Sequence, residues 1–113
     1  MPMPNADDAF VPLEKLTDYL LDLQHPIGGS KAVWFHGLGY HSSNKGVLEQ
    51  DLLQLVHTSE DFSLKDSPFG KKYIVSGTIT TPNGKKANLT TVWIIEANDS
   101  RPRLVTAIPG EKP

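Results

Sequence analysis

A chain of 113 residues is long enough for one domain with a single modest core and too short for two. Its net charge of −2 argues against a broadly basic protein that coats nucleic acid, although a local basic site is compatible with it. Cysteine is absent, which excludes thiol catalysis, disulfides and Cys-ligated zinc.

No segment of the sequence has the pattern of a membrane span or a secretion signal. No apolar run approaches the ~20 residues of a membrane-spanning helix. The first residues, Met1 to Asp8, lack the basic and apolar regions of a signal peptide. We therefore expect a soluble, cytoplasmic protein that makes no contact with a membrane.

The first half of the chain has the spacing of helices. Residues 1–11 are rich in Pro and Asp, which is typical of a flexible leader. Leucines at helical spacing predict a first helix over residues 12–23, which stops before the His25-Pro26 pair. A second helix is predicted from Ser30 to about His36, with a buried side formed by Ala32, Trp34 and Phe35. A third is predicted from about 44 to 57, with an apolar stripe of Val47, Leu48, Leu52, Leu55 and Val56.

The second half alternates between apolar and polar residues, as strands do. Strands are predicted over residues 60–66, 72–81, 85–97 and 103–108. Asn83-Gly84 is the clearest turn signal, because this pair accepts the positive φ angles of a tight hairpin. The pattern predicts an α+β domain over residues 12–109, followed by a tail at 110–113. About three N-terminal helices would pack on one face of a four-stranded antiparallel meander.

The stretch from His25 to Phe35 contains a candidate anion site. A Pro and two Gly residues precede Ser30, which is placed to cap the second helix, and Lys31 then falls in its first turn. Free N–H groups at a helix N-terminus attract anions, so Lys31 and this backbone would suit a phosphate or a carboxylate. An ordinary helix-loop-helix corner with a solvated lysine is the alternative.

The predicted third strand carries a second candidate surface. Alternation places Leu89, Thr91, Trp93 and Ile95 on one face, and Asn88, Thr90, Val92 and Ile94 on the other. Tyr73 with Val75, and Leu104 with Thr106, would lie on the neighbouring strands. Tyr, Thr and Trp on a sheet can stack a base and bind a phosphate, and they also serve in ordinary cross-strand packing.

Four separated motifs, in order, resemble an uncharacterised family of small bacterial domains of unknown function. They are His25-Pro26-x-Gly28-x-x-Lys31-Ala32-x-x-Phe35, Gly70-x-Lys72-Tyr73-x-Val75-x-Gly77, Thr91-Val92-Trp93-Ile94 and Pro102-Arg103-Leu104-Val105-Thr106-Ala107. The resemblance covers roughly residues 13 to 109. That family looks related to the barnase, EndoU, colicin and RelE group of ribonuclease toxins, which is an analogy at the level of fold. It implies helices before a four-stranded sheet, RNA cleavage without a metal, and an inhibitory partner protein.

RNA cleavage makes definite chemical demands on such a domain. A base must take the ribose 2′-OH proton, an acid must protonate the leaving 5′-oxygen, and cations must stabilise the crowded phosphorane. His25 is the candidate acid or base, because imidazole titrates near neutral pH, and Lys31 is the candidate electrostatic stabiliser. The other candidate catalytic residues are Tyr73, Thr91 and Thr106, and the candidate substrate-binding residues are Lys72, Trp93 and Arg103. A second histidine in a matching motif is missing, so the second proton-transfer role stays open.

Two functions from different classes fit this sequence. The first is a metal-independent ribonuclease-like toxin domain of a toxin-antitoxin-type pair, with RNA as substrate and an antitoxin-like protein as partner. The second is a noncatalytic interaction module, either the partner half of such a pair or a degenerate member, whose sheet face binds protein. We expect no cofactor and no metal, because the spacing of His25, His36 and His41 matches no ligand pattern. The sequence does not predict an oligomeric state.

Overall fold

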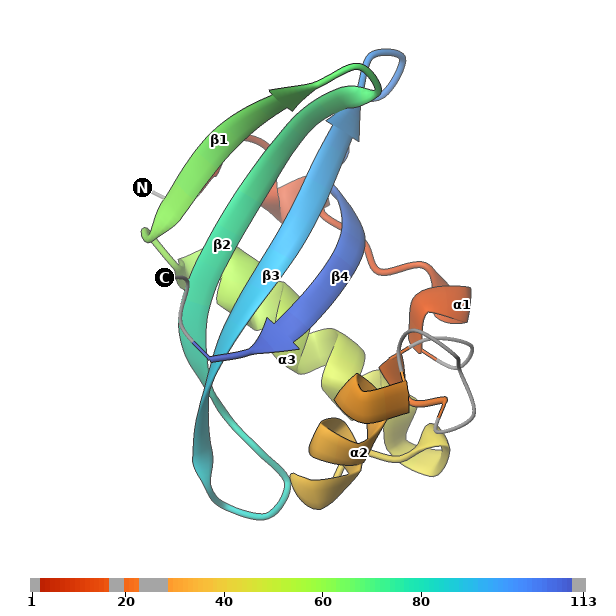
Figure 1. The fold of residues 1–113 in the computed structure, drawn as a ribbon. Helices are drawn as coiled ribbons and strands as arrows, with labels where there is room; N and C mark the ends of the chain where they lie inside the picture. The colour runs from red at the N-terminus through yellow and green to blue at the C-terminus, as the bar shows by residue number, and fades with distance from the viewer. Residues whose placement is uncertain (1–2, 17–19, 23–28, 111–113) are drawn as a thin grey trace.

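A computed structural model describes residues 3–16, 20–22 and 29–110, with the backbone alone at residues 29–31 and 42. Figure 1 shows helical segments followed by a single antiparallel sheet, which confirms the predicted α+β class. The helical elements are η1 (Ala6–Asp8), α1 (Leu13–Lys15), α2 (Gly29–Gly37), η3 (Ser42–Asn44) and α3 (Lys45–Thr58). The strands are β1 (Phe62–Ser67), β2 (Gly70–Thr80), β3 (Lys86–Glu96) and β4 (Arg103–Pro109).

The sheet is the predicted meander, with strand order β1-β2-β3-β4 and every neighbouring pair antiparallel. Its strands begin and end close to the predicted positions. The β2–β3 hairpin turns at Asn83-Gly84, where Gly84 has a φ of 78°. Glycine adopts this positive φ without steric cost, which is why the Asn-Gly pair predicts a turn here.

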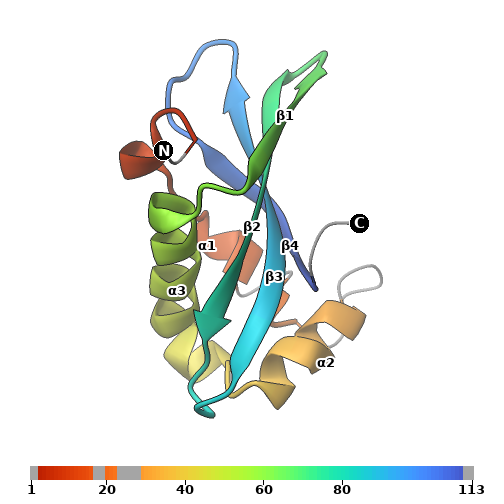
Figure 2. The same ribbon diagram turned by 90° about the vertical axis from the view of Figure 1, so that its left-hand side faces the viewer.

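Helix α3 covers one face of the sheet (Figure 2). Its buried side consists of Leu48, Leu52, Leu55 and Val56, which gives it the apolar stripe that the helical spacing predicts. Val47, expected in that stripe, is 42% exposed. The helix lies close to β2 at Gly77, where an added Cβ would come within 3.1 Å of the Leu55 side chain.

Residues 3–11, which their composition assigned to a flexible leader, pack on the domain. Met3, Ala6 and Val11 are at most 5% exposed and belong to the core. The Phe10 N–H donates to the carbonyl oxygen of Pro102, and the Phe10 carbonyl accepts from Leu104 N–H. This short parallel bridge lies along β4. The segment is too short and irregular to show a helical or alternating pattern, so its apolar anchors give no periodic signal.

The predicted first helix is described only in part. Helix α1 spans Leu13–Lys15, and Leu21 N–H donates to the Leu16 carbonyl oxygen, an i→i+5 bond typical of a π-type turn. Leu16 and Leu20 are buried as expected, whereas Leu13 is 59% exposed. Residues 17–19 and Leu23 lie outside the described residues.

Helix α2 lies near the end of β4 and contacts the β2–β3 hairpin (Figure 2). Ala32 and Phe35 are buried as predicted, whereas Trp34, also expected on the buried side, is only partly buried against the core. The Asn83 side-chain amide donates to the Gly37 carbonyl oxygen at 2.9 Å, and the Asn83 backbone N–H donates to the Leu38 carbonyl oxygen. The hairpin therefore holds the C-terminal end of α2 in place.

Candidate functional site

The sheet register sorts the predicted site residues onto two opposite faces. Directly opposed residues of an antiparallel sheet point to the same side, and successive residues alternate. The face covered by α3, here called the helix face, carries Tyr73, Val75, Thr91, Trp93, Leu104 and Ala107. The opposite face, here called the open face, carries Lys65, Lys72, Ile74, Val92, Ile94, Arg103 and Thr106.

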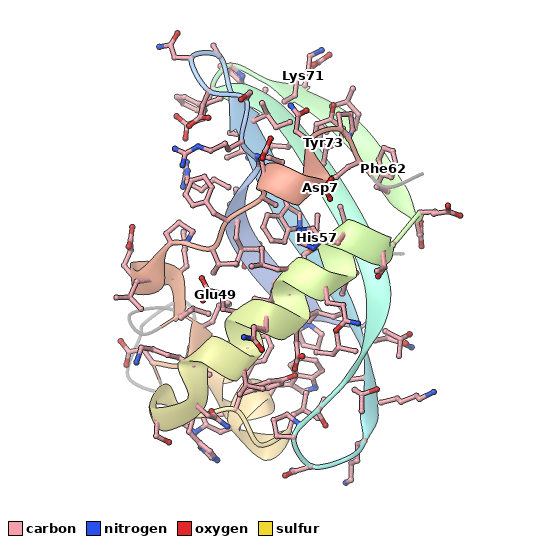
Figure 3. All side chains as sticks on the ribbon, turned by 180° about the vertical axis from the view of Figure 1, so that it is seen from behind. Asp7, Glu49, His57, Phe62, Lys71 and Tyr73 are labelled. Atoms are coloured by element: carbon pink, nitrogen blue, oxygen red, sulfur yellow. The ribbon has the colours of Figure 1, made fainter. Side chains whose placement is uncertain are left out.

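Tyr73, Thr91 and Trp93 lie inside the core on the helix face. Thr91 and Trp93 are fully buried, and Tyr73 is 7% exposed. The Trp93 indole N–H donates to Thr91 Oγ1 at 2.7 Å, and that hydroxyl donates to the Val75 carbonyl oxygen at 2.9 Å. Figure 3 shows Tyr73 and Phe62 on the helix side of the sheet, with ring centroids 6.0 Å apart. These contacts stabilise the core, and the catalytic and stacking roles of the three residues stay predictions.

Lys72, Arg103 and Thr106 lie on the open face and are all partly exposed. Arg103 donates from Nε and Nη2 to the same Glu96 oxygen, at 3.0 and 2.7 Å. Lys72 is half-buried next to Ile94, which is only 4% exposed. Aliphatic stems of Lys and Arg can cover an apolar residue while the charged ends reach solvent.

A β-bulge decides which face Thr106 occupies. Trp93 lies opposite Leu104 and Val92 lies opposite Thr106, with the register shift between Val92 and Trp93. Val105 is therefore the extra residue on β4, and Leu104 and Thr106 point to opposite faces. Simple alternation would have put these two side chains on one face. Neither Gly nor Pro marks the bulge in the sequence, so the pattern alone did not reveal it.

The structure places the two residues of the helix corner only in part. His25 lies outside the described residues. Lys31 occupies the first turn of α2, as predicted, but only its backbone is described. Since α2 lies near the end of β4, the first turn is at the same end of the sheet as Ile108 (Figure 2). Whether His25 and Lys31 share a hollow with the sheet residues stays a prediction.

Sequence reasoning missed three open-face residues. Lys65 lies directly opposite Lys72 on β1. Ser76 and Thr90 are at most 4% exposed, their hydroxyl oxygens are 3.3 Å apart, and Thr90 donates to the Gly110 carbonyl oxygen at 2.8 Å. All three share the open face with Lys72 because of how β1, β2 and β3 pair. The alternation along a single strand does not show this pairing.

The open face is more basic than the chain as a whole. Along its strands it carries the cations of Lys65, Lys72, Lys86 and Arg103, against the single carboxylate of Glu96. The whole chain has a net charge of −2. The local basic site that the overall charge permitted is therefore present on this face.

A hollow of about 160 Å³ lies between α3 and the end of β2, away from these residues. Its lining consists of Asp51, Gln54, Leu55, Thr58, Thr78, Ile79 and Thr80. The Tyr40 hydroxyl donates to Asp51 Oδ2 at 2.5 Å. Burial and the adjacent carboxylate raise the pKa of Tyr40 above its usual range, so this phenol stays protonated at neutral pH and is no base.

His36 and His41 are neighbours in space, with Nδ1 atoms 3.1 Å apart. His36 Nε2 is 3.1 Å from the Leu21 carbonyl oxygen, so both ring nitrogens of His36 have partners. Among the described residues no three His, Cys, Asp or Glu side chains gather into a possible metal site. The pair therefore joins α2 to the segments around Leu21 and His41.

Comparison with known proteins assigns a family and a fold. The family model of a domain of unknown function (DUF6883) matches residues 2–111. A chain of the contact-dependent growth inhibition toxin–immunity protein complex from Klebsiella pneumoniae 342 has a similar fold, with a TM-score of 0.73 and 20% identity. The alignment covers 96% of this chain and 98% of that one. A search of curated proteins found no match.

These findings confirm the resemblance to a family of domains of unknown function, while its link to the barnase and RelE group stays a prediction. Across the part of the chain that the structure describes, none of the helices has the length and apolar character needed to span a membrane.

Proposed function

The chain belongs to the DUF6883 family, and we propose that it is a toxin-type domain that cleaves RNA without a metal ion on the open face of its sheet. The observation that carries the proposal is the gathering of Lys72, Arg103 and Thr106 on a face that α3 does not cover. The fold shared with a chain of a toxin–immunity protein complex supports the toxin-type assignment.

The proposed reaction is an internal transfer at one phosphodiester. A base removes the ribose 2′-OH proton, the 2′-oxygen attacks phosphorus, and the bond to the 5′-oxygen breaks as an acid protonates that oxygen. The products are a 2′,3′-cyclic phosphate and a free 5′-hydroxyl. His25 performs one of these two proton transfers, and Lys31 stabilises the additional charge on the phosphorane.

The open-face side chains supply binding groups for the same substrate. Lys72 and Arg103 offer cationic N–H donors to phosphate oxygens, and Thr106 offers a hydroxyl. Glu96 holds the Arg103 guanidinium through two N–H groups and leaves other donors of the fork for a ligand. Proton transfer by His25 and charge stabilisation by Lys31 need no metal ion.

The test is cleavage of RNA by the purified full chain with EDTA present. We expect wild type to yield fragments ending in a cyclic phosphate and His25→Ala to lose most of this activity. His57→Ala is the matched control, because His57 is an exposed histidine in the last turn of α3. Growth arrest on expression of wild type, relieved by His25→Ala, would also support the proposal. Folded wild-type protein that leaves RNA intact, or cleavage that His25→Ala does not change, would contradict the proposal.

A noncatalytic interaction module is the second candidate function. The observation that favours it is the apolar part of the open face, where Ile108 is 37% exposed and Ile74 and Val92 are partly exposed. Exposed apolar patches often mark protein-binding surfaces. Harmless expression at high yield, together with inert purified protein in the RNA assay, would favour this module as the half of a pair that binds another protein.

A further inference from the structure

We propose that Lys65, Lys72 and Arg103 form a binding row for the phosphate backbone of single-stranded RNA, next to the reacting phosphate rather than at it. This inference rests on the proposed function, because both use the open face. The three residues, here called the cationic row, come from β1, β2 and β4. Lys65 was not among the candidates that sequence reasoning selected.

The sheet register aligns the cationic row. Lys65 lies opposite Lys72, Lys72 lies opposite Ile94, and Ile94 lies opposite Arg103. Opposed residues point to the same side, so the three cations follow one line across the strands. From β1 to β4 that line spans three strand spacings, or about 14 Å between backbones. An isolated phosphate is too small to contact both ends, whereas a polyanion can follow the whole row.

The cationic row contains an unfavourable pair. Like charges placed directly opposite each other on neighbouring strands destabilise a sheet, and Lys65 and Lys72 are such a pair. Within the described part of the chain neither ammonium belongs to an ion pair, whereas Arg103 is paired with Glu96. Phosphates bound to the two lysines would offset their mutual repulsion with attraction.

The side chains beside the cationic row favour a single strand over a duplex. Ile94, within the row, is only 4% exposed, but the next row along the strands contains Ile74 and Val92, which lie opposite each other and are partly exposed. Unpaired bases can pack their flat apolar faces on such a strip while the backbone follows the cations. A duplex keeps its bases stacked inside and offers only its backbone and grooves.

The cationic row lies away from the expected position of the reacting phosphate. It includes the first residue of β4, Arg103, whereas α2, whose first turn contains Lys31, lies near the other end of that strand (Figure 2). At about 3.4 Å per residue, Arg103 and Ile108 are roughly 17 Å apart along β4. We therefore expect the row to hold neighbouring phosphates of a longer strand, and a dinucleotide to react without using it.

The test is fluorescence anisotropy with a labelled, uncleavable 2′-O-methyl RNA of about ten nucleotides, titrated between about 50 and 200 mM salt. For wild type we expect affinity to fall roughly 20-fold over this range, as three phosphate contacts predict. Lys65→Gln and Lys72→Gln should each lower the slope of log Kd against log salt by about 0.7. Cleavage of a dinucleotide by Lys65→Gln should stay at the wild-type rate.

Lys71→Gln is the matched control, because Lys71 precedes Lys72 on β2 but lies opposite Ile95 on the other side of the sheet (Figure 3). The cationic row would be contradicted if the slope of log Kd against log salt did not change in Lys65→Gln and Lys72→Gln. It would also be contradicted if Lys71→Gln changed this slope equally. Binding of an acidic partner protein without any RNA binding would overturn it too. Row-dependent RNA binding without cleavage of unmodified RNA would refute the ribonuclease and leave the row standing. Cleavage of RNA together with unchanged salt slopes in the lysine variants would support the ribonuclease and refute the cationic row.

Discussion

Trp93 donates its indole N–H to Thr91 Oγ1 at 2.7 Å, and neither side chain is exposed to solvent. Thr91→Val keeps the shape of the side chain and removes the acceptor, which leaves a buried N–H without a partner. We expect a loss of about 1–3 kcal/mol in the free energy of unfolding, measured by urea denaturation. Thr91→Ser keeps the hydroxyl and should retain the hydrogen bond, although it loses a buried methyl group.

The same variant separates a structural Thr91 from a catalytic one. If the threonine only supports the core, Thr91→Val should cleave RNA normally at temperatures where circular dichroism shows it folded. A folded Thr91→Val protein without cleavage would support the catalytic role that the sequence predicts for this residue. Unfolding at the wild-type urea concentration would instead contradict the structural account of the Thr91–Trp93 bond.

The hairpin contact at Gly39 should tolerate no side chain. Gly39 has a φ of +99°, and an added Cβ would lie 2.8 Å from Asn83 Oδ1. Gly39→Ala therefore combines backbone strain with a clash, and we expect a loss of about 1–3 kcal/mol by thermal unfolding. Asn83→Ala removes the bond to Gly37 and should cost about 1 kcal/mol by itself.

A double-mutant cycle divides the Gly39→Ala loss into its two causes. The clash with the Asn83 side chain disappears when Asn83 is Ala, whereas the positive φ and the 3.1 Å contact with Pro82 Cβ remain. We therefore expect Gly39→Ala to cost less in the Asn83→Ala background than in wild type. Equal losses in the two backgrounds would show that the strain alone is responsible.

Tyr40 should make the fold sensitive to alkaline pH. Burial, and then Asp51, raise its pKa in the folded state above the ordinary value of 10.0. The folded protein therefore keeps this proton at a pH where the unfolded chain releases it. The stabilising contribution is complete below about pH 10 and declines as the pH rises further. Melting temperatures between about pH 9 and 11 should fall less steeply for Tyr40→Phe than for wild type. Parallel curves of melting temperature against pH for the two proteins would contradict the raised pKa of Tyr40.

The strands were predictable because each has a strong local pattern with clear turn signals between them. Asn83-Gly84 predicts the central hairpin, and the alternation along β3 puts Thr91 and Ile94 on opposite faces, as the register has them. The third helix was predictable for the same reason, since leucines at helical spacing leave one apolar side. These are local properties, and local properties are what a single sequence displays.

The arrangement of the candidate site was not predictable, because it depends on pairing between distant strands. The extra residue at Val105 moves Thr106 to the open face, and the opposition of Lys65 and Lys72 exists only in the paired sheet. Phe10 beside Arg103 is a further example, since its bridge joins the two ends of the chain. A spacing rule that follows one strand at a time contains none of this information.

Lys65→Glu should change stability and RNA binding in opposite directions. It replaces the repulsion between Lys65 and Lys72 with a cross-strand ion pair, so we expect a gain of a few tenths of a kcal/mol in urea denaturation at low salt. The same substitution brings a negative charge to the cationic row, and RNA affinity should fall by more than for Lys65→Gln. Lys71→Glu is the control, because it would face Asp66 on β1 and should lose stability. If Lys65→Glu lowered both quantities together, the repulsion between the two lysines would not be the cost that RNA binding relieves.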